Sequence, residues 1–318
     1  MILIIYKEEL KYQKNREDLF LLLSKFDKNQ YLILTLDSII SENNIDDLLN
    51  LSEISQLRNF NITHLFFYPR QIKIINQMKI FQLIADYPCK KTIYIDDLHD
   101  QNINLNIINK FDNKLITYPY LVDKFLPQIN NNIIKFPHYI NDQFCKSPEN
   151  VRNIQISILG HYLKKTYITR RYIIIRNYLI NAKLKNCSIT SFKDEVDNLT
   201  YYEILRNSYA SIATSCDRKT LYYPYIVSKY FEIPGCGALL IAHVLPEMEE
   251  ELSRLGFVDN LNYIAFKNVD ELIEKCNYIF DEKNKNEIET IRINGYNLIK
   301  NNHLISHRIK ELIKIFNN

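Results

Sequence analysis

The stretch KYFEIPGCGALLI, from Lys229 to Ile241, carries the most specific pattern in the chain. It predicts an apolar helix that includes Glu232 and breaks at Pro234-Gly235, followed by a buried strand that Gly237 opens. A carboxylate within such an apolar helix costs free energy unless another group binds it. Glu232 therefore either pairs with Lys229 at i, i+3 on the same helix face or holds a ligand.

Short apolar runs alternate with helical patterns on both sides of this stretch, which is typical of parallel sheets covered by helices. In the second half, the expected strands are Ile154–Leu159, Ser188–Ser191, Ala210–Thr214, Ala238–Ala242 and Leu261–Phe266. The expected helices are Arg170–Leu184, Thr200–Ser208, Ile226–Ile233, Pro246–Leu255 and Val269–Asp281, with one or two long helices over Lys285–Phe316.

The first half repeats this alternation. Its expected strands are Ile2–Tyr6, Tyr31–Leu36, Ile62–Tyr68, Thr92–Ile95, Lys114–Tyr118 and Asn132–Phe136, and its helical patterns include Asn15–Phe26, Asn44–Arg58 and Gln71–Tyr87. The polar segment Asn141–Arg152 reads as a linker. We therefore expect an α/β chain with two Rossmann-like domains, residues 1–145 and 150–318, facing across a cleft, with the C-terminal helices packing back over them.

The glycines favour phosphate binding in the second half. No glycine precedes Gly160, and the turn after the first strand is KEEL, which is a poor phosphate site. Gly160 ends a predicted strand and precedes a basic segment where a helix begins, with Lys164, Lys165, Arg170 and Arg171. Cations beside a helix N-terminus suit a diphosphate. The alternative is an ordinary solvated basic segment.

The residues from Tyr201 to Leu312 resemble the CgeB-like, or spore-maturation-type, glycosyltransferases, a branch of the GT-B group. KYFEIPGCGALL is similar to the family's R-x-F-E-[IA]-P-A-x-G-A-L-L, with Lys229 where arginine is usual. An acidic helix, VDELIEK, follows, and then a glycine, a histidine and an arginine in the family's order. Upstream, SILG and YITR resemble the S-F-V-G and Y-P-x-R that open the family's second domain.

This resemblance implies that the C-terminal domain binds a nucleotide-diphosphate sugar. Glu232 matches the glutamate that accepts hydrogen bonds from the ribose hydroxyls. Arg170 matches the cation near the diphosphate, and Gly160 lets the chain turn close to it. Lys229 and the backbone at Ser228 lie where a helix N-terminus is expected to meet phosphate.

The resemblance also implies the reaction, which is transfer of the sugar to an acceptor hydroxyl without metal or other cofactor, with retention at the anomeric carbon. Many retaining relatives carry a second glutamate that contacts the donor sugar. Pro224 stands at that position here, so the resemblance does not extend to recognition of the sugar.

The predicted strand KTIYI is followed by Asp96, Asp97, His99 and Asp100. In GT-B enzymes this strand end faces the donor, so the resemblance makes Asp97 and His99 candidate catalytic residues. His138, in an element that resembles the end of the family's first domain, is a candidate acceptor or cleft residue. The alternatives for the acidic cluster are a helix N-cap and a metal site built on Asp96 and Asp97.

Composition excludes some classes of function. The net charge of +3 is too small to indicate nucleic acid or an anionic membrane as a partner. No apolar run reaches the length of a membrane span or a signal peptide, so we expect a cytoplasmic protein without a transmembrane segment. The six cysteines form no CxxC pair and have no histidine at zinc-ligand spacing, which predicts reduced thiols.

The sequence is compatible with three functions. The first is a glycosyltransferase of glycan or glycoconjugate synthesis, with a nucleotide-sugar donor and a glycan, lipid-linked or protein acceptor. The second, which Pro224 favours, is an inactive GT-B-like protein that binds a nucleotide or a glycan or acts as a scaffold. The third is a metal enzyme that uses Asp96 and Asp97.

Overall fold

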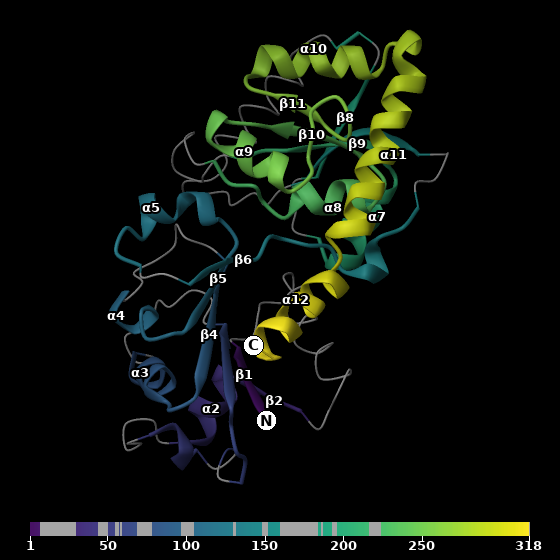
Figure 1. The fold of residues 1–318 in the computed structure, drawn as a ribbon. Coiled ribbons are helices and arrows are strands. Elements are labelled where there is room, and N and C mark those ends of the chain that lie inside the picture. The colour runs from purple at the N-terminus through teal and green to yellow at the C-terminus, as the bar shows by residue number, and fades with distance from the viewer. Residues whose placement is uncertain are drawn as a thin grey trace, which may run out of the picture. The chain divides into compact units, whose positions relative to one another are not determined.

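A computed structural model describes residues 1–6, 30–43, 50–54, 57, 59–68, 78–96, 105–129, 132–147, 152–159, 184–185, 187–192, 196–215 and 224–317. The chain divides into two compact units (Figure 1). Unit 1 comprises Met1–Pro137 and Arg308–Asn318, and unit 2 comprises His138–His307. This division differs from the expected 1–145 and 150–318 at both ends of the second domain.

Unit 1 is built on a parallel sheet. Its described strands have the order β2-β1-β3-β4-β5-β6. The strands are β1 (Ile2–Tyr6), β2 (Tyr31–Thr35), β3 (His64–Tyr68), β4 (Lys90–Ile95), β5 (Asn113–Ile116) and β6 (Ile133–Lys135). The helices described before residue 138 are α2 (Leu36–Glu42), η1 (Leu51–Glu53), α3 (Met78–Asp86), α4 (Leu105–Ile108), η3 (Pro119–Leu121) and α5 (Val122–Phe125). All residues of β1 and β3 are buried, as expected for central strands covered on both faces.

The C-terminal helix α12 (Ile305–Asn317) explains why the last residues group with unit 1. The Phe316 ring contacts the rings of His64 and Phe66 at centroid distances of 5.0 and 5.7 Å. The Arg308 Nε donates to the Pro137 carbonyl oxygen at 3.1 Å. Such contacts join residues far apart in the chain, so no local pattern predicts them.

The burial of His64 leads to a pH-dependent stability. Its Nε2 lies 2.9 Å from the Thr92 hydroxyl, and burial, assisted by the Lys90 charge, lowers the pKa of His64 from 6.5 to about 4. The unfolded chain therefore binds a proton between these pH values while the folded chain does not. The histidine's contribution to stability is complete above pH 6.5 and is lost as the pH falls toward 4.

We expect the free energy of unfolding to fall by about 2.5 kcal/mol more in the wild type than in His64→Gln between pH 7 and pH 4.5. Urea titrations of both proteins at the two pH values measure this difference. Equal losses in the two proteins would show that His64 is not held neutral.

Unit 2 is also built on a parallel sheet, with its described strands in the order β11-β10-β9-β7-β8. The strands are β7 (Ile154–Leu159), β8 (Ile189–Phe192), β9 (Ser208–Ala213), β10 (Leu239–His243) and β11 (Ile264–Phe266). The helices that the structure describes in this unit are η4 (Asp142–Phe144), α7 (Asn198–Arg206), α8 (Lys229–Gly235), α9 (Pro246–Arg254), α10 (Val269–Ile279), η5 (Glu282–Asn284) and α11 (Lys285–Asn302).

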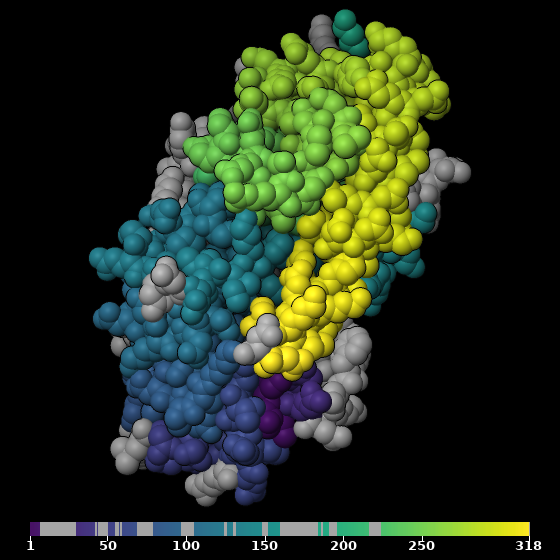
Figure 2. All heavy atoms as spheres, in the orientation of Figure 1, coloured from purple at the N-terminus to yellow at the C-terminus, as the bar shows by residue number. Residues whose placement is uncertain are grey.

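One face of this sheet packs against α10 and α11. Alternate strand residues such as Ile156, Ile212 and Ile241 form a buried cluster with Leu272 of α10 and Ile288 of α11. Helix α11 continues along one side of the surface of unit 2 (Figure 2). The strand residues between these positions face the other side of the sheet.

The structure corrects three predictions from the sequence. Helix α2 begins directly after β2, where Thr35 caps it by accepting from the Ser38 N–H at 3.0 Å, although no helix is expected there. Helix α8 runs through Pro234 to Gly235 instead of breaking before them. The first part of the predicted linker is packed, because the Phe144 ring stacks on Tyr202 at 3.9 Å. The helices predicted at 15–26 and 170–184 lie largely or wholly outside the described residues.

Two further expectations concern chemistry and location. All the cysteines that the structure describes are free thiols, and these are Cys89, Cys145, Cys187, Cys236 and Cys276. Over the described part of the chain, no helix combines the length and the apolar character needed to cross a membrane.

Candidate functional site

The strand order of unit 2 identifies the edge of the sheet where a ligand is expected. Strands β7 and β9 are neighbours, and the chain continues from β7 to β8 on one side and from β9 to β10 on the other. In open parallel sheets, ligands bind beyond the carboxyl ends of the strands at such a reversal. In unit 2 these carboxyl ends are Leu159 of β7 and Ala213 of β9. We call the side of the sheet that is formed by the carboxyl ends of its strands the ligand edge.

Helix α8 begins at the ligand edge. The Lys229 Nζ donates to the carbonyl oxygen of Leu159, the last residue of β7. Ser228 is the N-cap residue, with helical φ and ψ and no hydrogen bond from its side chain to the helix. The N–H groups of Phe231 and Glu232 donate to the Ser228 carbonyl oxygen at 2.9 and 3.0 Å. These two N–H groups are therefore already bonded within the chain, and phosphate binding by the helix start stays a prediction.

Glu232 lies in the first turn of α8 and is only 8% exposed. Its Oε2 accepts a hydrogen bond from the Tyr201 hydroxyl at 2.7 Å. Tyr201 belongs to α7, which precedes β9 and therefore begins at the same edge of the sheet as α8. The structure thus shows Tyr201 as a partner of this carboxylate, and it places the carboxylate near the ligand edge.

The second half of the stretch from Lys229 to Ile241 builds the turn at the opposite edge of the sheet. Gly237 has φ of +73°, a left-handed conformation that favours glycine. A Cβ on Gly235 would lie 2.8 Å from the Ile140 side chain, so this glycine permits close packing. Both glycines therefore serve the fold and not phosphate binding.

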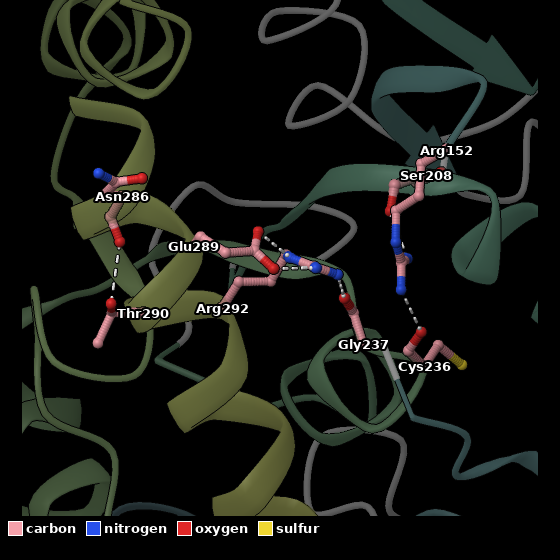
Figure 3. Close-up of polar contacts among 8 residues, drawn as sticks. All are labelled: Arg152, Ser208, Cys236, Gly237, Asn286, Glu289, Thr290 and Arg292. Carbon is pink, nitrogen blue, oxygen red and sulfur yellow. Dashed lines mark hydrogen bonds and ion pairs between the residues drawn. The ribbon is translucent and has the colours of Figure 1, made fainter. Parts of the chain in front are cut away.

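Two arginines hold this turn (Figure 3). Arg292, 2% exposed, donates to the Gly237 carbonyl oxygen at 2.6 Å and pairs with Glu289. Arg152 donates to the Cys236 carbonyl oxygen at 3.3 Å and to the Ser208 carbonyl oxygen at 2.7 Å. The arginines satisfy backbone acceptors where helix α8 passes into strand β10. No motif in the sequence indicates either one.

A second polar group lies at the ligand edge between β9 and β10. The Ser215 hydroxyl, which is fully buried, lies 2.8 Å from Nδ1 of His243, and Nε2 of His243 lies 3.2 Å from the Lys267 carbonyl oxygen. Because a carbonyl only accepts, Nε2 carries the proton and Nδ1 accepts from Ser215. Both ring nitrogens are thus engaged, which favours a supporting role. In the sequence, Ser215 and His243 each directly follow a predicted strand, and this position is the only local signal that indicates the pair.

In unit 1, a buried polar pair lies at the carboxyl ends of β3 and β4. Asp96, 5% exposed, accepts a hydrogen bond from the Tyr68 hydroxyl at 2.9 Å, and the Tyr68 ring stacks on Tyr94. The candidate catalytic residues Asp97 and His99 follow directly but lie outside the described residues. Gly160 and Arg170 of the predicted diphosphate site also lie outside them.

His138 and Pro224 are buried residues of unit 2. The His138 ring, 5% exposed, lies edge-on to Phe231 of α8 at a centroid distance of 6.2 Å. His138 therefore packs beneath α8 and begins unit 2, whereas the sequence predicts that it closes the first domain. Among the residues that the structure describes, no cluster of three or more histidine, cysteine or acidic side chains is arranged to hold a metal.

Comparison with solved structures gives the fold type. The glycosyltransferase from Rickettsia africae ESF-5 matches with a TM-score of 0.66 and 10% identity over 99% of this chain and 97% of that one. HepE from Anabaena, in complex with UDP and glucose, matches with a TM-score of 0.66 and 11% identity over 99% of both chains. A chain of the GtfA/B complex matches with a TM-score of 0.51 and 12% identity over 80% of this chain, which spans 57% of its length.

At these identities the likeness concerns the fold, which is the two-domain GT-B type with a Rossmann-like sheet in each unit. No curated protein matches the chain. The family model described as glycosyl transferase-like matches residues 149–314, which are more than half of the 318 residues. This segment contains the whole sheet of unit 2, including Glu232 and the turn held by the two arginines. The chain belongs to the glycosyl transferase-like family.

Proposed function

We propose that this protein is a CgeB-like glycosyltransferase that moves a sugar from a nucleotide-diphosphate sugar to the hydroxyl of a glycan, lipid-linked or protein acceptor. The observation that carries the proposal is the buried carboxylate of Glu232 one helical turn after Lys229, at the start of a helix that begins at the ligand edge. A carboxylate accepts hydrogen bonds from hydroxyl groups, and an ammonium group attracts phosphate.

The ribose and the diphosphate then each have partners in unit 2. Glu232 accepts from the ribose hydroxyls, and Lys229 and Ser228 lie beside the diphosphate. Gly160 and Arg170 complete the diphosphate site. The leaving diphosphate gains negative charge in the transition state, so cations placed against it lower the barrier. In unit 1, Asp97 and His99 are the proposed catalytic residues. The packing of His138 against Phe231 favours a supporting role over acceptor binding.

The cations replace a metal ion in this proposal, so the reaction needs neither metal nor another cofactor. We propose retention at the anomeric carbon, by analogy with the retaining relatives, and NMR of the product anomer decides it. We propose uridine as the base, because UDP is bound in the structure of HepE, which shares the fold.

The test is a thermal-shift panel of UDP, GDP, dTDP, CMP and ADP, each with and without EDTA. We expect UDP to raise the melting temperature by several degrees, because a ligand at 100 times its dissociation constant stabilises by about 2.7 kcal/mol. EDTA should leave this shift unchanged. A shift that EDTA abolishes would support the metal enzyme, and no shift with any nucleotide would contradict the proposed donor site.

A second candidate is a protein that binds the nucleotide sugar without transferring it. It is favoured by Pro224, a buried residue at the position where retaining relatives carry a glutamate that contacts the sugar. Incubation with UDP-sugars separates the two functions. Release of UDP, by transfer or by slow hydrolysis of the donor, supports the enzyme, whereas binding without any release supports the second candidate.

A further inference from the structure

We propose that Tyr201 is a positioning residue of the donor site, which holds the Glu232 carboxylate in the orientation that receives the ribose hydroxyls. This inference rests on the proposed function and extends it to a residue outside the stretch from Lys229 to Ile241. The hydrogen bond from the Tyr201 hydroxyl to Oε2 of Glu232 is 2.7 Å long and joins the first turns of two helices.

Tyr201 is itself held in place. Helix α7 is capped by Asp197, whose Oδ1 accepts from the Thr200 N–H at 3.0 Å and whose carbonyl oxygen accepts from the Tyr201 N–H at 2.9 Å. The Tyr201 ring lies edge-on to Tyr202 at 5.2 Å, and the Tyr202 ring stacks on Phe144. The capped start of α7 and this ring stack fix the position from which the hydroxyl reaches Glu232.

The arrangement suits a carboxylate that must receive two further hydrogen bonds. A carboxylate offers about four acceptor positions, so a bond from Tyr201 leaves capacity for both ribose hydroxyls. A glutamate side chain has three rotatable bonds, and a ligand that must select one rotamer of it loses affinity. The Tyr201 hydroxyl removes part of this cost before the nucleotide arrives. Loss of the Tyr201 hydroxyl should therefore weaken only the binding of ligands that carry ribose hydroxyls, because these are the groups that donate to Glu232.

The test compares Tyr201→Phe with the wild type in calorimetric titrations of UDP and of 2′,3′-dideoxy-UDP. We expect Tyr201→Phe to weaken UDP binding about fivefold, in line with one hydrogen bond to a charged group acting indirectly. The affinity for dideoxy-UDP should be the same in both proteins. In turnover of a UDP-sugar, the variant should raise KM by a similar factor and leave kcat unchanged.

Tyr278→Phe is the matched control. The Tyr278 hydroxyl interacts with the Glu287 carboxylate, which raises the pKa of Tyr278. This variant therefore also removes a tyrosine–glutamate interaction between two helices of unit 2. Tyr278 lies near the end of α10, away from the ligand edge, so the affinities for both ligands should remain those of the wild type.

Several outcomes overturn the inference. Equal or tighter UDP binding by Tyr201→Phe would show that the hydroxyl does not help the carboxylate. An equal loss for both ligands would show direct contact with the nucleotide or a general structural effect. Equal affinity of the wild type for UDP and dideoxy-UDP would show that no group of the protein binds the ribose hydroxyls. Wild-type protein that binds neither ligand contradicts the proposed uridine donor site itself, and the inference fails with it.

Discussion

Replacing Arg292 with alanine is expected to lower the free energy of unfolding by about 3 kcal/mol. Arg292 is 2% exposed, and its guanidinium group donates to the Gly237 carbonyl oxygen at 2.6 Å (Figure 3). The guanidinium group also lies over the Tyr209 ring, 5.6 Å from its centroid. Alanine leaves that carbonyl oxygen without its donor, leaves Glu289 without its cation and removes the packing of the long side chain. Urea titration followed by circular dichroism measures the loss.

Thr290→Ala is the control for this prediction, because it lies on the same helix and deletes one exposed hydrogen bond, from the Thr290 hydroxyl to the Asn286 carbonyl oxygen at 2.9 Å. Alanine is also the better helix former, so we expect a change of less than about 0.5 kcal/mol. If Arg292→Ala costs no more than this control, the turn is stable without the arginine.

Replacing Glu232 with alanine is expected to weaken UDP binding about 100-fold, because two hydrogen bonds between ribose hydroxyls and a charged acceptor are lost. The thermal shift with UDP should disappear at ligand concentrations that shift the wild type by several degrees. Calorimetric titration gives the dissociation constants, and circular dichroism confirms that the variant is folded. The prediction follows from the position of Glu232 at the ligand edge.

Glu251→Ala is the control for Glu232. Glu251 is also buried, 5% exposed, but it lies on α9 beside Arg254, and we assign it no contact with the nucleotide. We expect this variant to lose some stability and to keep the wild-type affinity for UDP. An unchanged affinity in Glu232→Ala would remove the ribose role of this glutamate, whereas equal losses in both variants would indicate damage to unit 2 as a whole.

Part of the candidate site could be predicted from the sequence alone. The apolar helix with one glutamate and the strand after Gly237 are local patterns, and α8 and β10 confirm them to within a few residues. The sequence predicts that the helix ends before Pro234, because proline usually breaks a helix. The structure shows that α8 continues through Pro234 to Gly235. The sequence groups the last residues with the second domain, whereas Arg308–Asn318 group with unit 1, because the contact between Phe316 and His64 leaves no local signal.

The sequence by itself determined the alternation of strands and helices and the two-domain α/β organisation, and it singled out Glu232 as the candidate residue for a ligand. These properties depend on residue spacing and on glycine and proline, which act on the neighbouring backbone. Only the tertiary structure decided which groups meet the polar atoms of that stretch. Tyr201 reaches Glu232 across 31 residues, and Arg292 reaches Gly237 across 55. A buried polar atom needs a partner, and folding supplies it from whichever element packs beside it.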